Sequence, residues 1–214
     1  MNQIDVIELT KKIKETVILD KVSLQMEEGK IYGLIGRNGS GKTMLIRSLA
    51  GIMEPTEGEI RYNGKILYKE IPVIPSIGVV IGGVGLYPEL TGMENLLQLA
   101  NIKKKIGKEE IAKTIIQVGL DPKDRRAYRK YSLGMKQRII IAQAIMEKPE
   151  VLLMDEPTNG LDEEGVKLIR ELLQRKKEEG CLILLASHNA EDIRQLCDKV
   201  YRVDKGKVKK EEDI

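Results

Sequence analysis

The chain has 214 residues and a formal net charge of +3 from 36 basic and 33 acidic side chains, which suits one large domain and does not by itself indicate a nucleic-acid partner. Its two cysteines, Cys181 and Cys197, have no paired spacing, so the sequence indicates a reducing compartment without a disulfide or metal framework. No apolar run approaches the roughly 18 residues that cross a bilayer, and we expect no signal peptide, so a membrane role would require a partner protein.

Short β-branched runs separated by turns fill the first third of the chain. They cover residues 4–9, 22–30 and 58–67, and the last run contains NGK at Asn63–Lys65. Asn-Gly between two such runs is a hairpin signal. We therefore expect a small, largely antiparallel sheet beside the main core.

A glycine-rich loop, GRNGSGKT, follows the apolar run IYGLI and precedes an amphipathic helix. It fits the pattern G-x-x-x-x-G-K-[ST], and the strand before it and helix after it are the context that the motif requires. A glycine-rich turn that binds nothing is the alternative, and this context argues against it. Backbone N–H groups of such a loop surround phosphate oxygens, the lysine reaches the β and γ phosphates, and the threonine hydroxyl coordinates Mg²⁺. The predicted nucleotide ligands are Gly36, Arg37, Asn38, Gly39, Ser40, Gly41, Lys42 and Thr43.

The middle of the chain changes to helical periodicity. Residues 93–102, 108–120 and 132–148 carry apolar side chains at helical spacing, and Ser132 suits the N-cap of the third helix. After this stretch, strands and helices alternate to a final short hairpin. The pattern predicts an α/β fold, with a P-loop NTPase parallel-sheet core, an N-terminal antiparallel β subdomain and an inserted helical subdomain at about residues 86–147.

The run VLLMDE ends a predicted buried strand with Asp155 and Glu156 side by side. Adjacent side chains on a strand point to opposite faces, so the two acids are expected to have different roles. Beside a P-loop, Asp155 suits the Mg²⁺ ion and Glu156 suits the water that attacks the γ-phosphate. The alternative is that the acids merely end the strand.

The only histidine, His188, follows Ser187 at the end of the strand CLILLASH. We expect this strand to lie beside the one that carries Glu156, which would bring His188 near the γ-phosphate. A purely structural histidine is the alternative.

Together these motifs resemble the ATP-binding cassette (ABC) family, and specifically the nucleotide-binding subunit of an ABC transporter. The resemblance covers about residues 4–208, so that residues 1–214 would form a single nucleotide-binding domain. GRNGSGKT is similar to the Walker A loop, VLLMDE to Walker B and YSLGM to the signature motif. NGLD, ending at Asp162, resembles the D-loop, and His188 the switch histidine. SLGMKQR and GLYPELTGMENL are most similar to exporters of peptide antibiotics and drugs, the ABC-2 type.

The resemblance implies a mechanism and a set of partners. Two cassettes, identical or related, would pair head to tail with ATP between them, and Ser132 and Gly134 would contact the γ-phosphate of the partner's site. ATP and Mg²⁺ are the implied cofactors. The implied partner is an integral-membrane permease at the inner face of the cell membrane, which places the chain in the cytoplasm, and no nucleic acid is expected.

The chain departs from the family pattern at several positions. Leu133 and Met135 replace a glycine and the glutamine of the signature, and Ile13 falls closest to the usual adenine-stacking aromatic. Gly82 occupies the position where the Q-loop normally has a glutamine or glutamate. These departures leave open a cassette that binds ATP with little turnover. The motifs also leave open two different functions, a ribosome- or DNA-acting ABC ATPase and a small-molecule P-loop kinase.

Overall fold

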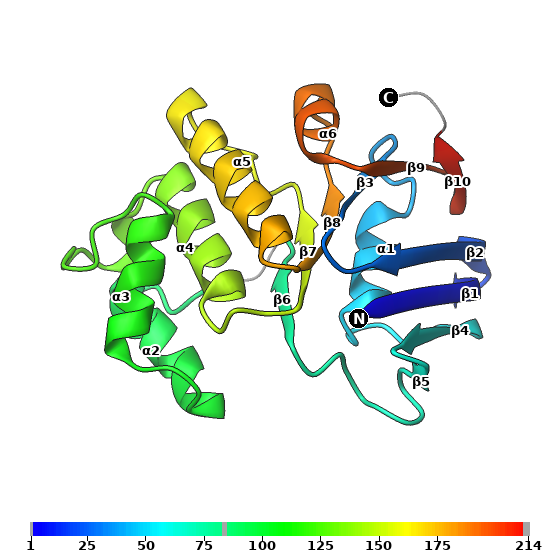
Figure 1. Ribbon diagram of the computed structural model, residues 1–214, viewed down its shortest axis with the longest axis horizontal. Coiled ribbons are helices and arrows are strands. Elements are labelled where there is room, and N and C mark those ends of the chain that lie inside the picture. Colours follow the sequence, from blue (N-terminus) through cyan, green and yellow to red (C-terminus); the bar gives the residue numbers. More distant parts are fainter. Residues whose placement is uncertain (1, 83–84, 212–214) are drawn as a thin grey trace.

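The computed structural model describes residues 2–82 and 85–211 (Figure 1). Its strands are β1 (Gln3–Ile13), β2 (Thr16–Glu27), β3 (Ile31–Ile35), β4 (Glu57–Tyr62), β5 (Lys65–Ile66), β6 (Ile77–Val80), β7 (Val151–Asp155), β8 (Leu182–Ala186), β9 (Lys199–Asp204) and β10 (Lys207–Glu211). Its helices are α1 (Lys42–Leu49), α2 (Gly92–Lys103), α3 (Lys108–Gln117), α4 (Leu133–Ile145), α5 (Glu163–Glu178) and α6 (Ala190–Leu196), with a 3₁₀ turn at Tyr128–Lys130.

The strands form two sheets, which confirms the predicted fold class. The main sheet has the order β10-β9-β3-β8-β7-β6 and is parallel except for β10, which pairs antiparallel with β9. The second sheet is antiparallel, with the order β2-β1-β4-β5. Its β4–β5 turn has Asn63 at φ 50° and Gly64 at φ 81°, as the Asn-Gly signal predicts. Strand β6 is absent from the sequence prediction.

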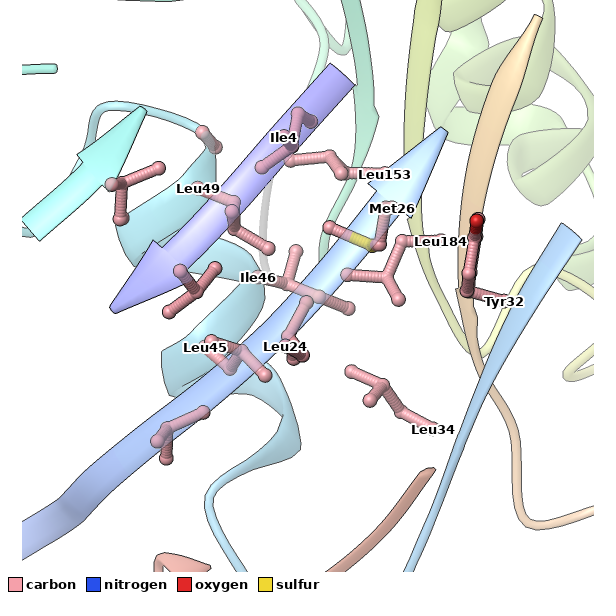
Figure 2. Packing of buried hydrophobic residues seen from close by; sticks show 14 of the residues in the cluster. Ile4, Leu24, Met26, Tyr32, Leu34, Leu45, Ile46, Leu49, Leu153 and Leu184 are labelled. Atoms are coloured by element: carbon pink, nitrogen blue, oxygen red, sulfur yellow. The ribbon is translucent and has the colours of Figure 1, made fainter. Parts of the chain in front are cut away.

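Alternation along the central strands divides the apolar side chains between two cores. In β7, Val151 and Leu153 face α1 and the antiparallel sheet, whereas Leu152 and Met154 face the other side, where α4 and α5 pack. Figure 2 shows the first core, in which α1 packs between the two sheets. Because both faces are covered, these strands are apolar throughout, as the run VLLM is.

Helices α2, α3 and α4 contribute to the second core and lie beside the main sheet at the β6 edge (Figure 1). Helix α4 approaches β6 closely, since a Cβ atom added to Gly78 would lie 2.0 Å from the carbonyl oxygen of Ala144. The Tyr131 hydroxyl, just before α4, accepts a hydrogen bond from the Gly92 N–H at the start of α2. The structure therefore ties the beginning of α4 to α2 and its end to the sheet.

Both cysteine thiols are free, and burial raises the pKa of each to about 12. In the part of the chain that the structure describes, no helix has the length and apolarity needed to cross a membrane.

Candidate active site

The glycine-rich loop connects the end of β3 to the start of α1, as the motif predicts. Three of its glycines have positive φ: Gly36 at 153°, Gly39 at 77° and Gly41 at 116°. A Cβ atom at Gly36 would lie 2.2 Å from the carbonyl oxygen of Val203, so no other residue fits there without moving β9. Glycine is thus required for the loop to curl against the sheet.

Lys42 is buried within the curl of this loop, with 6% of the residue exposed. Its ammonium donates hydrogen bonds to the carbonyl oxygens of Gly36 at 2.7 Å and Arg37 at 3.2 Å. The Ser40 hydroxyl is also buried, and it has no hydrogen-bond partner among the described residues. The loop therefore holds one cation and one hydroxyl close to its backbone.

A cavity of about 520 Å³ opens along the loop. It is lined by Ile18, Asn38, Gly39, Ser40, Gly41, Lys42, Thr43, Met44, Arg47, Asp155 and Glu156. Gly36, Arg37 and His188 line an adjoining cavity of about 400 Å³. Ile18, Met44 and Arg47 were not predicted, although Met44 directly follows the motif and Arg47 lies further along α1.

Asp155 meets Thr43 at the mouth of the loop. The Thr43 hydroxyl donates a hydrogen bond to Asp155 Oδ2 at 2.6 Å, joining the first turn of α1 to the end of β7. The sequence predicted that both residues would serve one Mg²⁺ ion, and the structure brings their oxygen atoms together. Two adjacent oxygen donors are suited to a hard cation.

Strand alternation, which was the sequence-based argument for two different roles, does not extend to Glu156, and both Asp155 and Glu156 line the cavity. Strand β7 ends at Asp155, and Glu156 has the left-handed φ of 53°, with its N–H donating to the carbonyl oxygen of Ala186 at 2.9 Å. A left-handed non-glycine residue is uncommon and costs free energy, so the surrounding contacts must hold it. The turn after the strand therefore sets the position of Glu156, whose partner differs from that of Asp155.

Glu156 contacts His188 across neighbouring strands. Nδ1 of His188 lies 2.7 Å from Glu156 Oε2, and the His188 N–H donates to the same oxygen at 3.3 Å. Strands β7 and β8 are parallel neighbours with Asp155 opposite Ala186, which confirms the predicted adjacency. The Glu156 side chain is 23% exposed and that of His188 is 64% exposed, so the pair lies at the surface of the cavities.

The predicted signature residues lie outside the cavity of their own chain. Ser132 caps α4 by accepting a hydrogen bond from the Met135 N–H at 3.2 Å, as predicted. A Cβ atom at Gly134 would lie 3.1 Å from the carbonyl oxygen of Gly160, so this segment packs on residues 159–162. Leu133 is 71% exposed between them.

Asp162 connects the segment after β7 to α4. Its carboxylate accepts from the Gly165 N–H at 3.1 Å, which caps α5, and pairs with the Arg138 guanidinium at 2.8 Å. Gln137 also contacts this segment by donating to the carbonyl oxygen of Pro157 at 3.1 Å. The sequence-based prediction missed the contacts of Gln137 and Arg138, although both belong to the quoted run SLGMKQR.

Two further predicted positions lie apart from this cluster. Ile13 ends β1, is 44% exposed and pairs with Thr16, and the cavity lining includes Ile18 instead. Gly82 follows β6, and a Cβ atom added there would meet none of the described residues within 4 Å. Its neighbours Gly83 and Val84 lie outside the described residues. The adenine contact of Ile13 and the Q-loop position of Gly82 stay predictions.

Comparisons with known proteins identify the family to which this chain is similar. The profile described as ABC transporter matches residues 19–159. The chain is 46% identical over 211 residues to the uncharacterized ABC transporter ATP-binding protein YybJ of Bacillus subtilis, covering 99% of this chain and 97% of that protein. It is 40% identical over 208 residues to the bacitracin transport ATP-binding protein BcrA of Enterococcus faecalis, covering 96% of this chain and 68% of that protein.

A solved structure agrees with the sequence comparisons. The dimeric structure of a bacterial ABC transporter cassette superimposes with a TM-score of 0.87 at 25% identity, covering 97% of each chain. The structure places the predicted P-loop after β3, Asp155 at the end of β7, Glu156 directly after it and His188 after β8. The chain belongs to the ABC transporter family, as an ATP-binding subunit whose ATP hydrolysis drives transport.

Proposed function

We propose that this chain powers export of a peptide antibiotic or a drug-like molecule through a separate integral-membrane permease, by hydrolysing Mg²⁺-ATP at the P-loop. The observation that carries the hydrolysis is the contact between Glu156 and His188 at 2.7 Å beside the loop that holds Lys42. The similarity to a bacitracin transport protein supports the substrate class. In this proposal residues 1–214 form one nucleotide-binding domain with the helical insertion at about residues 86–147.

The P-loop residues bind the triphosphate. Backbone N–H groups of residues 36–43 and the N-terminus of α1 supply positive potential for the phosphate oxygens. Lys42 donates to loop carbonyls, and we assign its ammonium to the β and γ phosphates when nucleotide binds. Nucleotide binding would replace the contacts of the Lys42 ammonium to the loop carbonyl oxygens with contacts to phosphate oxygens.

Thr43 and Asp155 are suited to hold Mg²⁺. Protein Mg²⁺ sites typically use one or two carboxylates together with substrate phosphates, and the hydroxyl and carboxylate oxygens here are 2.6 Å apart. Among the residues that the structure describes, no group of three or more His, Cys, Asp and Glu side chains is assembled for a metal, which agrees with a site completed by the nucleotide. When bound, the ion would neutralise charge that develops on the phosphates.

Glu156 is the residue that we assign to the attacking water. Its carboxylate can accept a hydrogen bond from water and so orient it toward the γ-phosphate. His188 holds that carboxylate through Nδ1, and we assign Nε2 of the same ring to the γ-phosphate. The two side chains would then act together on the water and on the group under attack.

A second cassette completes the site in this proposal. Ser132 and Gly134 stand at the N-terminus of α4 but do not line the cavity of their own chain, so a second copy or a related cassette would present them to the γ-phosphate. The exposed Leu133 beside them suits a surface that becomes covered. The dimeric structure of the similar cassette supports such pairing.

The permease supplies the membrane path and the substrate specificity. In this proposal the chain is cytoplasmic and lies on the inner face of the cell membrane through contact with the permease. Recovery of the chain with an integral-membrane protein from detergent extracts would support this arrangement. Recovery with ribosomes or DNA instead would favour a non-transport ABC ATPase.

Substitution of Glu156 by glutamine tests the hydrolytic role. Glu156→Gln keeps the side-chain size but removes the charge that orients water, so turnover of ATP should fall by roughly 10²-fold or more. ATP binding should be retained, and an ATP-dependent dimer should accumulate in size-exclusion chromatography. Glu109→Gln, on the exposed side of α3, is the matched control and should keep the wild-type rate.

Two results would contradict this assignment. Unchanged turnover in Glu156→Gln would remove the proposed role of this carboxylate. A wild-type chain that binds ATP without measurable turnover, alone and with its permease, would favour a cassette that mainly binds ATP, which Gly82 leaves open.

A further inference from the structure

A fully buried carboxylate on α6, Asp192, collects hydrogen bonds from three other segments of the chain. It accepts from the Thr158 hydroxyl at 2.5 Å and the Ser187 hydroxyl at 3.2 Å. The Arg170 guanidinium on α5 donates to it through Nε at 2.7 Å and pairs with it at 2.6 Å through Nη2. A buried charge is costly unless it is paired and hydrogen-bonded, and here both conditions are met.

The two hydroxyl groups belong to the segments that carry Glu156 and His188. Thr158 follows Glu156 by two residues in the turn after β7, and Ser187 directly precedes His188 at the end of β8. The Ser187 hydroxyl also accepts a hydrogen bond from the Asn189 N–H at 3.1 Å. It therefore bonds to the residue that follows His188 as well as to Asp192. Thr158 is 8% exposed and Ser187 is 1% exposed, so water does not compete for these bonds.

We propose that Asp192 is a positioning residue, which ties the segment after β7 to the segment after β8 and so holds Glu156 and His188 in contact. The inference rests on the proposed function and adds the group that maintains its catalytic pair. The Glu156 N–H donates to the carbonyl oxygen of Ala186 at the end of β8, and the bonds of Asp192 to Thr158 and Ser187 add a side-chain connection between the same two segments. Arg170 neutralises the buried carboxylate, so that the tie is fixed to α5 as well.

The connection through Asp192 can be tested by removing its hydrogen bond from Thr158, which leaves the Asp192–Arg170 ion pair intact. A substitution of Asp192 itself would leave the Arg170 guanidinium without its buried carboxylate partner. We therefore choose a substitution of Thr158 instead. Thr158→Val keeps the shape and removes the hydroxyl, whereas Thr158→Ser keeps the hydroxyl. Misplacement of a catalytic group by 1 Å can cost about 10²-fold, and we expect Thr158→Val to lower kcat about 10-fold. KM for ATP should stay within about twofold, since Thr158 does not line the cavity, and Thr158→Ser should restore kcat.

A buried threonine far from the site provides the matched control. Thr114 on α3 is 6% exposed, and its hydroxyl donates to the carbonyl oxygen of Glu110 at 2.9 Å. Thr114→Val therefore makes the same chemical change at the same burial, with no link to Glu156 or His188. It should lower the melting temperature as Thr158→Val does, while kcat stays at the wild-type value.

His188 provides a second readout that does not depend on turnover. It is the only histidine, so the ¹H–¹³C signal of its ring in the full chain is assigned without ambiguity. In Thr158→Val this signal should move toward its position in Glu156→Gln, where the carboxylate partner is absent, and in Thr114→Val it should not move.

The outcomes separate this inference from the proposed function. If Thr158→Val and Thr114→Val give the same kcat and the same His188 signal, Asp192 has only a structural role and the inference is overturned. If the His188 signal moves but Glu156→Gln turns over ATP at the wild-type rate, the tie is supported and the hydrolytic assignment fails.

Discussion

Gly78 lies in β6 where the strand passes against the end of α4, and it has no room for a side chain. A Cβ atom there would lie 2.0 Å from the carbonyl oxygen of Ala144 and 2.8 Å from Cδ2 of Leu152. Ordinary contact begins at 3.4 Å, so Gly78→Ala requires α4 and β6 to separate by about 1.4 Å. The backbone carbonyl cannot turn aside as the end of a flexible side chain can.

The cost follows from this overlap. Overpacking a filled interior costs about 1–3 kcal/mol. For a chain of this size each kcal/mol lowers the melting temperature by about 2–4 °C, so we expect a decrease of about 2–12 °C. Because α4 begins at the signature-like residues, its displacement should also slow ATP turnover.

Thermal unfolding followed by circular dichroism measures the effect, with Gly82→Ala as the matched control. The same methyl group at Gly82 contacts none of the residues in the described ranges 2–82 and 85–211, so the melting temperature of Gly82→Ala should change by less than about 2 °C. If Gly78→Ala melted at the same temperature as Gly82→Ala, the close approach of α4 to β6 would not limit stability and the reasoning would be refuted.

Three other changes can be tested in the same way. Gly82→Gln should raise turnover or lower the Mg²⁺ concentration for half-maximal rate with little effect on ATP affinity, since no described residue would contact a Cβ atom there. If both the rate and the metal dependence stay unchanged, this would count against a Q-loop role. Ser132→Arg mixed with Lys42→Ala should regain ATPase activity that neither has alone, and no recovery despite proven dimerisation would contradict pairing in trans. Burial raises the pKa of Cys181 and Cys197 to about 12, so both thiols stay protonated at pH 8. Iodoacetamide should therefore label them far more slowly in the folded chain than in urea. Equal labelling rates would show that burial does not protect the two thiols.

The nucleotide loop could be predicted because everything that shapes it is local. The strand, the glycines and the helix are consecutive, and the positive φ values at Gly36, Gly39 and Gly41 are conformations that glycine adopts readily. Asp155 and Thr43 were expected close together because both were assigned to one Mg²⁺ ion. His188 was expected near Glu156 because apolar runs that end in polar residues indicate neighbouring parallel strands.

Other features depend on contacts that no local pattern records. Strand β6 has only the residues Ile77–Val80 and includes Gly78, so its identity as a strand comes from pairing with β7 and from α4. Asp155 and Glu156 contact different partners, and a left-handed turn rather than strand alternation places Glu156. The sequence argued for two different roles from an alternation that ends with β7 at Asp155.

The sequence by itself thus predicted the loop, the two carboxylates and the histidine that we assign to the phosphates, the metal and the water. Tertiary structure decided what holds them in place, as Asp192 illustrates. As an acid in a short polar helix it gives no sign of burial, and it lies 34 residues from Thr158 and 22 from Arg170. Only the packing of α5 and α6 beside the ends of β7 and β8 removes it from water, and a carboxylate removed from water must find such partners.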